Sequence, residues 1–149
     1  MDLMRKKLIA SALSAAAATT LTQTGAAQAD STEWDFGDPA KNVACGTRLY
    51  PDGENWVQCD IGKHTWVGPD SAPCAQDVGA TFMLREAGAP EISCFTAGQV
   101  LPTIYYVLGY GQTRATRAIT CDSETSGITC TNTNTKHFFR VSRDSYQVG

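Results

Sequence analysis

Six cysteines constrain this chain more than any other feature of its sequence. In an exported domain an even number of cysteines predicts disulfides, here three, although six cysteines permit 15 pairings. Zinc binding is the rival interpretation, but it needs closely spaced thiolates of the CxxC kind, and the nearest two cysteines are nine positions apart. The six residues of the expected disulfide framework are Cys45, Cys59, Cys74, Cys94, Cys121 and Cys130.

The amino-terminal segment has the pattern of a bacterial export signal. A basic group, Arg5 to Lys7, precedes the apolar stretch Leu8 to Leu21, and Ala27-Gln28-Ala29 supplies a small-x-small cleavage site. The apolar stretch is shorter than the roughly 20 residues of a membrane span, and no later run is long enough. We therefore predict a signal peptide over residues 1–29, a mature chain beginning at Asp30, no membrane span, and a secreted or periplasmic location.

The predicted mature chain has 120 of the 149 residues and is acidic. Nine of the twelve basic residues remain without Arg5, Lys6 and Lys7, and fourteen of the fifteen acidic residues remain without Asp2, for a net charge of −5. Eleven of these acids lie between positions 30 and 91, and three lie beyond. Since nucleic-acid binding needs a strongly basic face, we expect no nucleic-acid partner.

Two pairs of cysteines stand where hairpins would place them opposite each other. Facing residues of an antiparallel hairpin are equally far from the centre of its turn, and their Cβ atoms come within roughly 4.5–5.5 Å, close to disulfide reach. The pairs are Cys45 with Cys59 around Pro51-Asp52-Gly53, and Cys121 with Cys130 around Thr125-Ser126. In the second pair each cysteine follows two β-branched residues, Ile119-Thr120 and Ile128-Thr129, which favour strands.

The third disulfide, Cys74–Cys94, is expected by elimination. The turn Ala87-Gly88-Ala89-Pro90 predicts a further hairpin over residues 80–95, in which Met83 faces Cys94. Cys74 would then lie in a loop that folds back on this hairpin. Each disulfide typically contributes about 2–4 kcal/mol, so three of them are comparable with the whole stability of a small domain.

Short strands separated by turn signals, without helical periodicity, predict an all-β sandwich or small barrel built of hairpins. An acidic arm over residues 30–41, with two tucked aromatic side chains, is expected to precede a single β domain over residues 42–149. The apolar run Ile104 to Leu108 predicts a buried strand. Phe139 and Val141 are expected on one face of a last strand, and Arg140 on the other.

Several phrases of the mature chain follow one pattern over roughly residues 41–146. These are Asn42-Val43-Ala44-Cys45, Val57-Gln58-Cys59-Asp60-Ile61, Cys74 with Asp77 and Gly79, and Ile128-Thr129-Cys130-Thr131-Asn132 with the tail His137-Phe138-Phe139, Ser142-Arg143 and Tyr146. The pattern resembles a family of small exported bacterial proteins classed as a domain of unknown function. That family usually has a glycine directly before the histidine and another shortly before the fifth cysteine, where this chain has Lys136 and Arg117-Ala118. The resemblance implies secretion and paired cysteines, and it implies no activity.

Catalytic patterns are weak in this sequence. A serine hydrolase needs a nucleophile and an oriented base, but no GxSxG elbow is present, and His137 and Ser142 would point to opposite faces of one strand. With the thiols oxidised and two histidines in the chain, metal ligands are few. We therefore expect no metal site, no cofactor and no enzymatic activity; a weak hydrolase with His137 as base is the alternative.

Two groups of residues are candidates for binding. A basic, aromatic segment near the carboxyl end could grip anionic groups, or pair with the acidic first half. Its candidate binding residues are His137, Arg140, Arg143 and Tyr146. A second set could form a carbohydrate platform, although aromatic side chains in so small a domain are mostly core. This set is Trp34, Trp56, Trp66, Tyr105, Tyr106 and Tyr110.

The favoured function is a non-catalytic binding or inhibitory module. Its expected partner is a component of the cell envelope or a secreted protein, contacted by rigid, disulfide-closed hairpins. A structural protein of the cell envelope is the remaining alternative.

Overall fold

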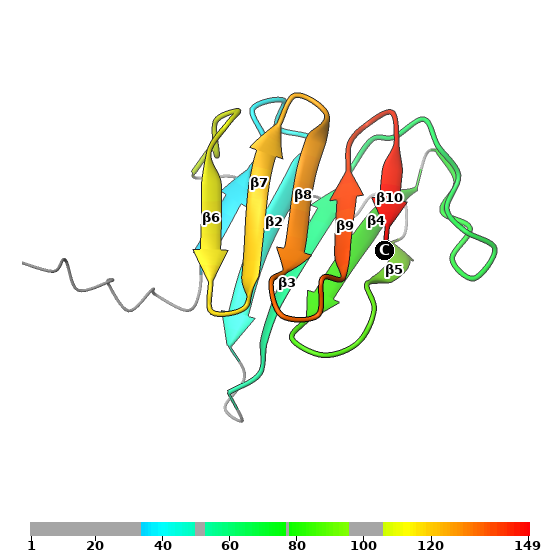
Figure 1. Cartoon of the computed structure of the whole chain (residues 1–149). Helices are drawn as coiled ribbons and strands as arrows, with labels where there is room; N and C mark the ends of the chain where they lie inside the picture. The colour runs from blue at the N-terminus through cyan, green and yellow to red at the C-terminus, as the bar shows by residue number, and fades with distance from the viewer. Residues whose placement is uncertain (1–33, 50–52, 77, 96–105) are drawn as a thin grey trace, which may run out of the picture.

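A computed structural model describes residues 34–49, 53–76, 78–95 and 106–149, and there the chain is all-β, with ten strands in two antiparallel sheets. In Figure 1 the second sheet, yellow to red, lies in front of the first, cyan to green. The first sheet contains β1 (Trp34–Gly37), β2 (Val43–Leu49), β3 (Asn55–Ile61), β4 (Gly79–Arg85) and β5 (Glu91–Phe95). The second contains β6 (Thr113–Thr116), β7 (Ile119–Glu124), β8 (Gly127–Asn132), β9 (Phe138–Val141) and β10 (Tyr146–Val148). The predicted signal peptide lies outside the described residues.

Each sheet is a meander in which neighbours in sequence are neighbours in space. Strand side chains alternate between the two faces, and β3 shows this as a strict alternation of buried and half-buried positions. The buried faces of the two sheets meet, with β4 packed against β8 and β9, and β3 against β7. The predicted all-β fold is thus confirmed, in the form of a two-layer sandwich.

One row of side chains repeats in the two sheets and meets at the centre of the core. In each sheet the row runs from the cysteine of the second strand to the cysteine of the third and then to a phenylalanine of the fourth. The rows are Cys45, Cys59 and Phe82 in the first sheet, and Cys121, Cys130 and Phe139 in the second. The Sγ atoms of Cys59 and Cys130 are 3.9 Å apart, and the rings of Phe82 and Phe139 are 5.5 Å apart.

All three predicted disulfides are present in the structure. Cys45–Cys59 joins β2 to β3, and Cys121–Cys130 joins β7 to β8, each between directly facing residues. The remaining bridge joins Cys74, in the long connection after β3, to Cys94 on the edge strand β5. Three disulfides are compatible with an oxidising location.

The predicted register of the β4–β5 hairpin was wrong by three residues. Ala80 faces Cys94, and Met83 instead faces Glu91, so the hairpin is centred on Ala87 and not after Gly88. The cause lies in the neighbouring strand, because Glu86 still donates its backbone N–H to the carbonyl of Asn55 on β3. Pairing with β3 therefore moves the turn toward the amino end.

The segment expected as an acidic arm contributes a strand. Trp34 and Phe36 are buried as expected, but they belong to β1, which pairs with β2. The strand expected at Ile104 to Leu108 lies partly outside the described residues. Within the described part Leu108 is buried, Val107 is exposed and forms a single bridge to Gly37, and no named strand includes them.

Candidate functional site

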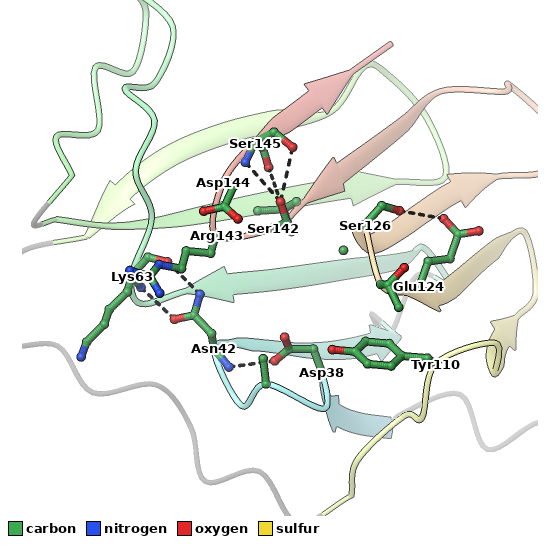
Figure 2. A pocket seen from close by; sticks show the side chains of 14 residues that line it. Asp38, Asn42, Lys63, Tyr110, Glu124, Ser126, Ser142, Arg143, Asp144 and Ser145 are labelled. Carbon is green, nitrogen blue, oxygen red and sulfur yellow. Dashed lines mark hydrogen bonds between the residues drawn. The ribbon is translucent and has the colours of Figure 1, made fainter.

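A polar cleft of about 600 Å³ lies at one end of the sandwich, and we call it the end cleft. Five segments meet there: the β1–β2 turn, the start of the β3–β4 connection, the turn around Tyr110, the β7–β8 turn and the β9–β10 turn (Figure 2). It is lined by Asp38, Ala40, Asn42, Lys63, Tyr110, Glu124, Thr125, Ser126, Gly127, Val141, Ser142, Arg143, Asp144 and Ser145. Its size falls within the range typical of small-molecule sites, but its lining is far more polar than usual.

The first wall of the end cleft is the β1–β2 turn, which Asp38 organises. One carboxylate oxygen of Asp38 accepts the backbone N–H groups of Asn42 and Val43, at 2.8 and 2.9 Å. The side chain of Asn42 in turn donates to the carbonyl of Lys63 and accepts its N–H, at 2.7 and 3.0 Å. The backbone of Lys63 is thereby fixed, while its side chain remains exposed.

The second wall is the tight β7–β8 turn. Glu124 and Gly127 close it, and Ser126 donates its hydroxyl to the Glu124 carboxylate at 3.2 Å. Gly127 has φ +128°, and a Cβ atom there would collide with the carbonyl oxygen of Val141 on the neighbouring strand. This position therefore requires glycine, and the close approach of β8 to β9 keeps the turn beside the cleft.

The third wall is the β9–β10 turn, which carries Arg143. Ser142 and Ser145 bind each other through both backbone and hydroxyl groups, with Ser142 N–H donating to the Ser145 carbonyl at 2.9 Å. The backbone of this turn is fixed by its own hydrogen bonds, whereas the side chains of Arg143 and Asp144 are exposed.

The β3–β4 connection supports this third wall from outside. Thr65 donates its backbone N–H to the Arg143 carbonyl at 2.9 Å, and the indole N–H of Trp66 donates to the Ser142 carbonyl at 3.0 Å. The Trp66 ring also packs against Tyr146, with ring centroids 4.7 Å apart. The connection thus ties the end of the first sheet to the β9–β10 turn of the second.

Two devices hold the β3–β4 connection in place. One is the disulfide between Cys74 and Cys94. The other is the buried ring of His64, whose nitrogens lie 2.8 and 2.7 Å from the carbonyl oxygens of Trp66 and Val78, and whose face stacks on Trp66 at 3.7 Å. His64 is therefore explained by a structural role within the connection.

The two cations of the end cleft lie at one end of its lining, together with Asp144. Figure 2 shows Lys63 and Arg143 there, with the Lys63 side chain directed outward, and Tyr110 with Glu124 at the other end. Neither Lys63 nor Arg143 forms an ion pair with a residue in the described ranges. Tyr110 is 53% exposed and carries its ring beside the cleft. One end therefore offers cationic donors, and the other offers carboxylate acceptors with an aromatic face.

The structure does not bring together the four residues of the basic, aromatic segment. Arg143 lines the end cleft, whereas His137 precedes β9 at its other end and lies 3.2 Å from the Gly149 carbonyl oxygen. Arg140 donates to the Thr129 hydroxyl at 3.0 Å. Tyr146 packs on Trp66. His137 and Ser142 are five positions apart along an extended strand, about 16 Å, so they form no catalytic pair.

Most residues of the end cleft escaped sequence analysis because they come from separate turns. Arg143 and Tyr110 were among the candidates, whereas Asp38, Lys63 and Glu124 were not. The signal that could have found them is topological. In a meander alternate turns lie at the same end, so strand order groups the turn after β1 with the residues that follow β3, and the turn after β7 with the turn after β9. The stacking of the two sheets then brings these two groups together.

Within the described ranges, no three histidine, cysteine, aspartate or glutamate side chains are grouped closely enough to hold a metal ion. Nor does the described part of the chain contain a helix of the length and hydropathy needed to cross a membrane. Comparison of the chain with protein-family models, with curated proteins and with solved structures found no match.

Proposed function

We propose that this protein is an exported, non-catalytic binding module, and that its end cleft takes a carboxylated saccharide of the cell envelope or its surroundings. The proposal rests on two cations, Lys63 and Arg143, at one end of the cleft. Neither has an ion-pair partner among the described residues, and most of the remaining lining consists of hydroxyl, amide and carboxylate groups. The predicted signal peptide and the three disulfides support a periplasmic or extracellular location.

The chemistry of the lining favours a saccharide. Sugar hydroxyls both donate and accept, and they are best met by a mixture of carboxylates, amides and cations. Ala40 and Val141 are the two aliphatic residues among the described lining, so few side chains there are suited to an aliphatic side chain of a peptide. The exposed ring of Tyr110 offers a face on which a sugar ring can stack.

The two cations favour a ligand that carries a carboxylate group. Arginine matches a carboxylate with two parallel hydrogen bonds, and lysine adds a point charge with three donors. Asp144 lies beside Arg143 in the same turn, so this end carries one net positive charge from the three side chains. A ligand carboxylate would compensate that charge, while Glu124 and Asp38 would accept hydroxyl groups farther along.

The two alternatives receive less support from the geometry. A hydrolase with His137 as base would need a nucleophile near that ring, and the ring instead faces the carbonyl of Gly149. A purely structural envelope protein would not require two cations in a cleft without ion-pair partners among the described residues. The binding module therefore remains the conclusion.

The test is titration of the mature protein with oligogalacturonate, a carboxylated oligosaccharide, followed by amide NMR. We expect shifts at Lys63, Tyr110, Glu124 and Arg143, and weaker binding at high salt because exposed charges are screened. Cello-oligosaccharide, which lacks carboxylates, should bind at least about tenfold more weakly, as expected for the loss of a charged hydrogen bond.

Substitutions locate the site. Lys63→Ala and Arg143→Ala should each weaken oligogalacturonate binding about tenfold or more. Lys136→Ala is the matched control, because its amine donates to the Thr133 carbonyl in the β8–β9 turn, outside the cleft. Arg140→Ala should also leave binding unchanged. If the saccharide shifts no amide of the end cleft, or if all four variants bind alike, the proposed function is wrong.

A further inference from the structure

The three disulfides differ sharply in exposure. The four cysteines of the two core bridges are at most 4% exposed, and they lie between the sheets. Cys94 is exposed on the edge strand β5, although its partner Cys74 is buried. A thiolate reductant must reach a sulfur atom to break a disulfide, and the bridge with one exposed residue is the most open of the three to such an approach.

The exposed bridge is also the one connected to the end cleft. Cys74 closes the β3–β4 connection, and its carbonyl accepts the N–H of Gly68 in the same connection. That connection contributes the hydrogen bonds from Thr65 and Trp66 to the Arg143 and Ser142 carbonyls. The core bridges instead join neighbouring strands inside each sheet, where the pairing of the strands holds the same residues together.

We infer that Cys74–Cys94 is a redox switch for the end cleft: its reduction by an external dithiol loosens the β3–β4 connection and releases the turn that carries Arg143. The effect on ligand binding rests on the function proposed above, whereas the release of the turn does not.

Reduction of the Cys74–Cys94 disulfide requires no reactant other than the dithiol. One thiolate of the dithiol attacks the Cys94 sulfur, the Cys74–Cys94 bond breaks, and Cys74 leaves as a thiolate that takes up a proton. The second thiolate of the dithiol then displaces the Cys94 sulfur, which is also protonated. The protein gains two electrons and two protons, and the dithiol becomes a disulfide. Reoxidation reverses the step.

Loosening follows from what remains in the connection after reduction. The bridge closes a loop whose ends are 20 positions apart. Without it, the connection is held by the His64 ring, by Gln76, whose amide donates to the Thr65 carbonyl, and by its own backbone hydrogen bonds. The contacts of Lys63 with Asn42 and of Trp66 with the β9–β10 turn would remain, but the bridge at the far end of the loop would no longer support them. Exposed backbone hydrogen bonds in a long loop open readily, so Thr65 would release Arg143 more often.

The first experiment treats the mature protein with dithiothreitol for increasing times, traps free thiols with iodoacetamide and maps the labelled cysteines by mass spectrometry. We expect labels on Cys74 and Cys94 well before the other four cysteines. Labelling of all six together, or of a core pair first, would overturn the inference.

The second experiment follows the released turn without any ligand. Amide hydrogen exchange of Thr65 should be at least about tenfold faster in Cys74→Ser/Cys94→Ser than in the oxidised wild type, and exchange of core amides such as Cys59 and Cys130 should change far less. Reoxidised wild-type protein is the control and should return to slow exchange. Unchanged exchange at Thr65 would refute the switch.

The third measurement connects the switch to binding. Oligogalacturonate should bind the double variant about five- to tenfold more weakly than the oxidised protein. If oxidised protein does not bind the saccharide while Thr65 exchange responds to reduction, the proposed ligand fails and the switch stands. If the saccharide binds both forms equally, the switch does not control the cleft and the inference is wrong.

Discussion

The two sheets of this sandwich follow one plan and differ mainly in one connection. Both are five-stranded meanders whose second and third strands are joined by a disulfide that lies beside a phenylalanine of the fourth. In the first sheet the third and fourth strands are joined by residues 62–78, and in the second by residues 133–137. The longer connection holds Cys74, His64 and Trp66. The comparison separates two tasks of disulfides: the repeated pair stabilises the core, and the unrepeated one fixes a wall of the cleft.

The largest effect is expected from removing a ring at the centre of the repeated row. Phe139→Ala should lower the free energy of unfolding by about 3–5 kcal/mol, because Phe139 is fully buried and packs on Phe82. Phe82→Ala should cost a similar amount if the two rows are equivalent. Urea denaturation measures both, and a cost below about 1 kcal/mol for either would break the equivalence.

Removing disulfides comes next and separates the two tasks. Chain entropy alone predicts a loss of about 3 kcal/mol for Cys121→Ala/Cys130→Ala, to which lost core packing adds, and a similar entropic loss for Cys74→Ala/Cys94→Ala. The core pair should therefore cost more stability, while only the second pair should change the end cleft. Denaturation and Thr65 amide exchange test this; equal changes at Thr65 would contradict it.

A polar residue replaces an apolar one at matching places in the third strands of the two sheets. Ile61 and Asn132 both follow the third-strand cysteine by two positions, and both are fully buried. Asn132 donates to the carbonyls of Arg85 and Glu86, thereby connecting the second sheet to the first, and accepts two N–H groups of its own turn. Asn132→Leu should cost about 2–3 kcal/mol by denaturation, because these groups lose their partner. A neutral result would mean that water replaces the amide.

The smallest effect is expected at the outer surface. Arg48 forms an ion pair with Asp35 at 2.8 Å, but both side chains are largely exposed, so water screens the attraction. Arg48→Ala should change the free energy of unfolding by about 0.5 kcal/mol or less. A loss above about 1 kcal/mol would show that the β1 edge contributes more to the first sheet than its exposure suggests.

Local spacing explains why much of the fold could be predicted. Cys121 and Cys130 face each other because a two-residue turn fixes the register of their hairpin. Cys45 likewise faces Cys59 because the two are equally far from the centre of the longer connection between their strands. The rule failed for Cys94, because β4 also pairs with β3, and this pairing shifted the β4–β5 turn. A prediction that considers only the two strands of a hairpin does not include the effect of a third strand. No local sequence pattern indicates how the two sheets stack on each other.

The end cleft depends on that stacking, and so little of it was predictable. Asp38 looks like an ordinary turn residue, and Lys63 like a solvated charge, until the stacking of the two sheets brings them near Arg143. Sequence analysis grouped Arg143 with Arg140 and His137 because the three are close along the chain, and closeness along the chain says nothing about which end of a sandwich a turn occupies. The role of Cys74 in supporting Arg143 required the hydrogen bonds of Thr65 and Trp66.

The disulfides join the cysteines strictly in order along the chain, first to second, third to fourth and fifth to sixth. In a polypeptide that becomes oxidised as it emerges amino end first, each bridge can close before the next cysteine appears, so correct pairing follows from timing. A close contact between sulfur atoms of different bridges, Cys59 to Cys130, involves the last sulfur to arrive. Synthesis in that direction would thus guard against the mispairing that refolding of the complete reduced chain invites.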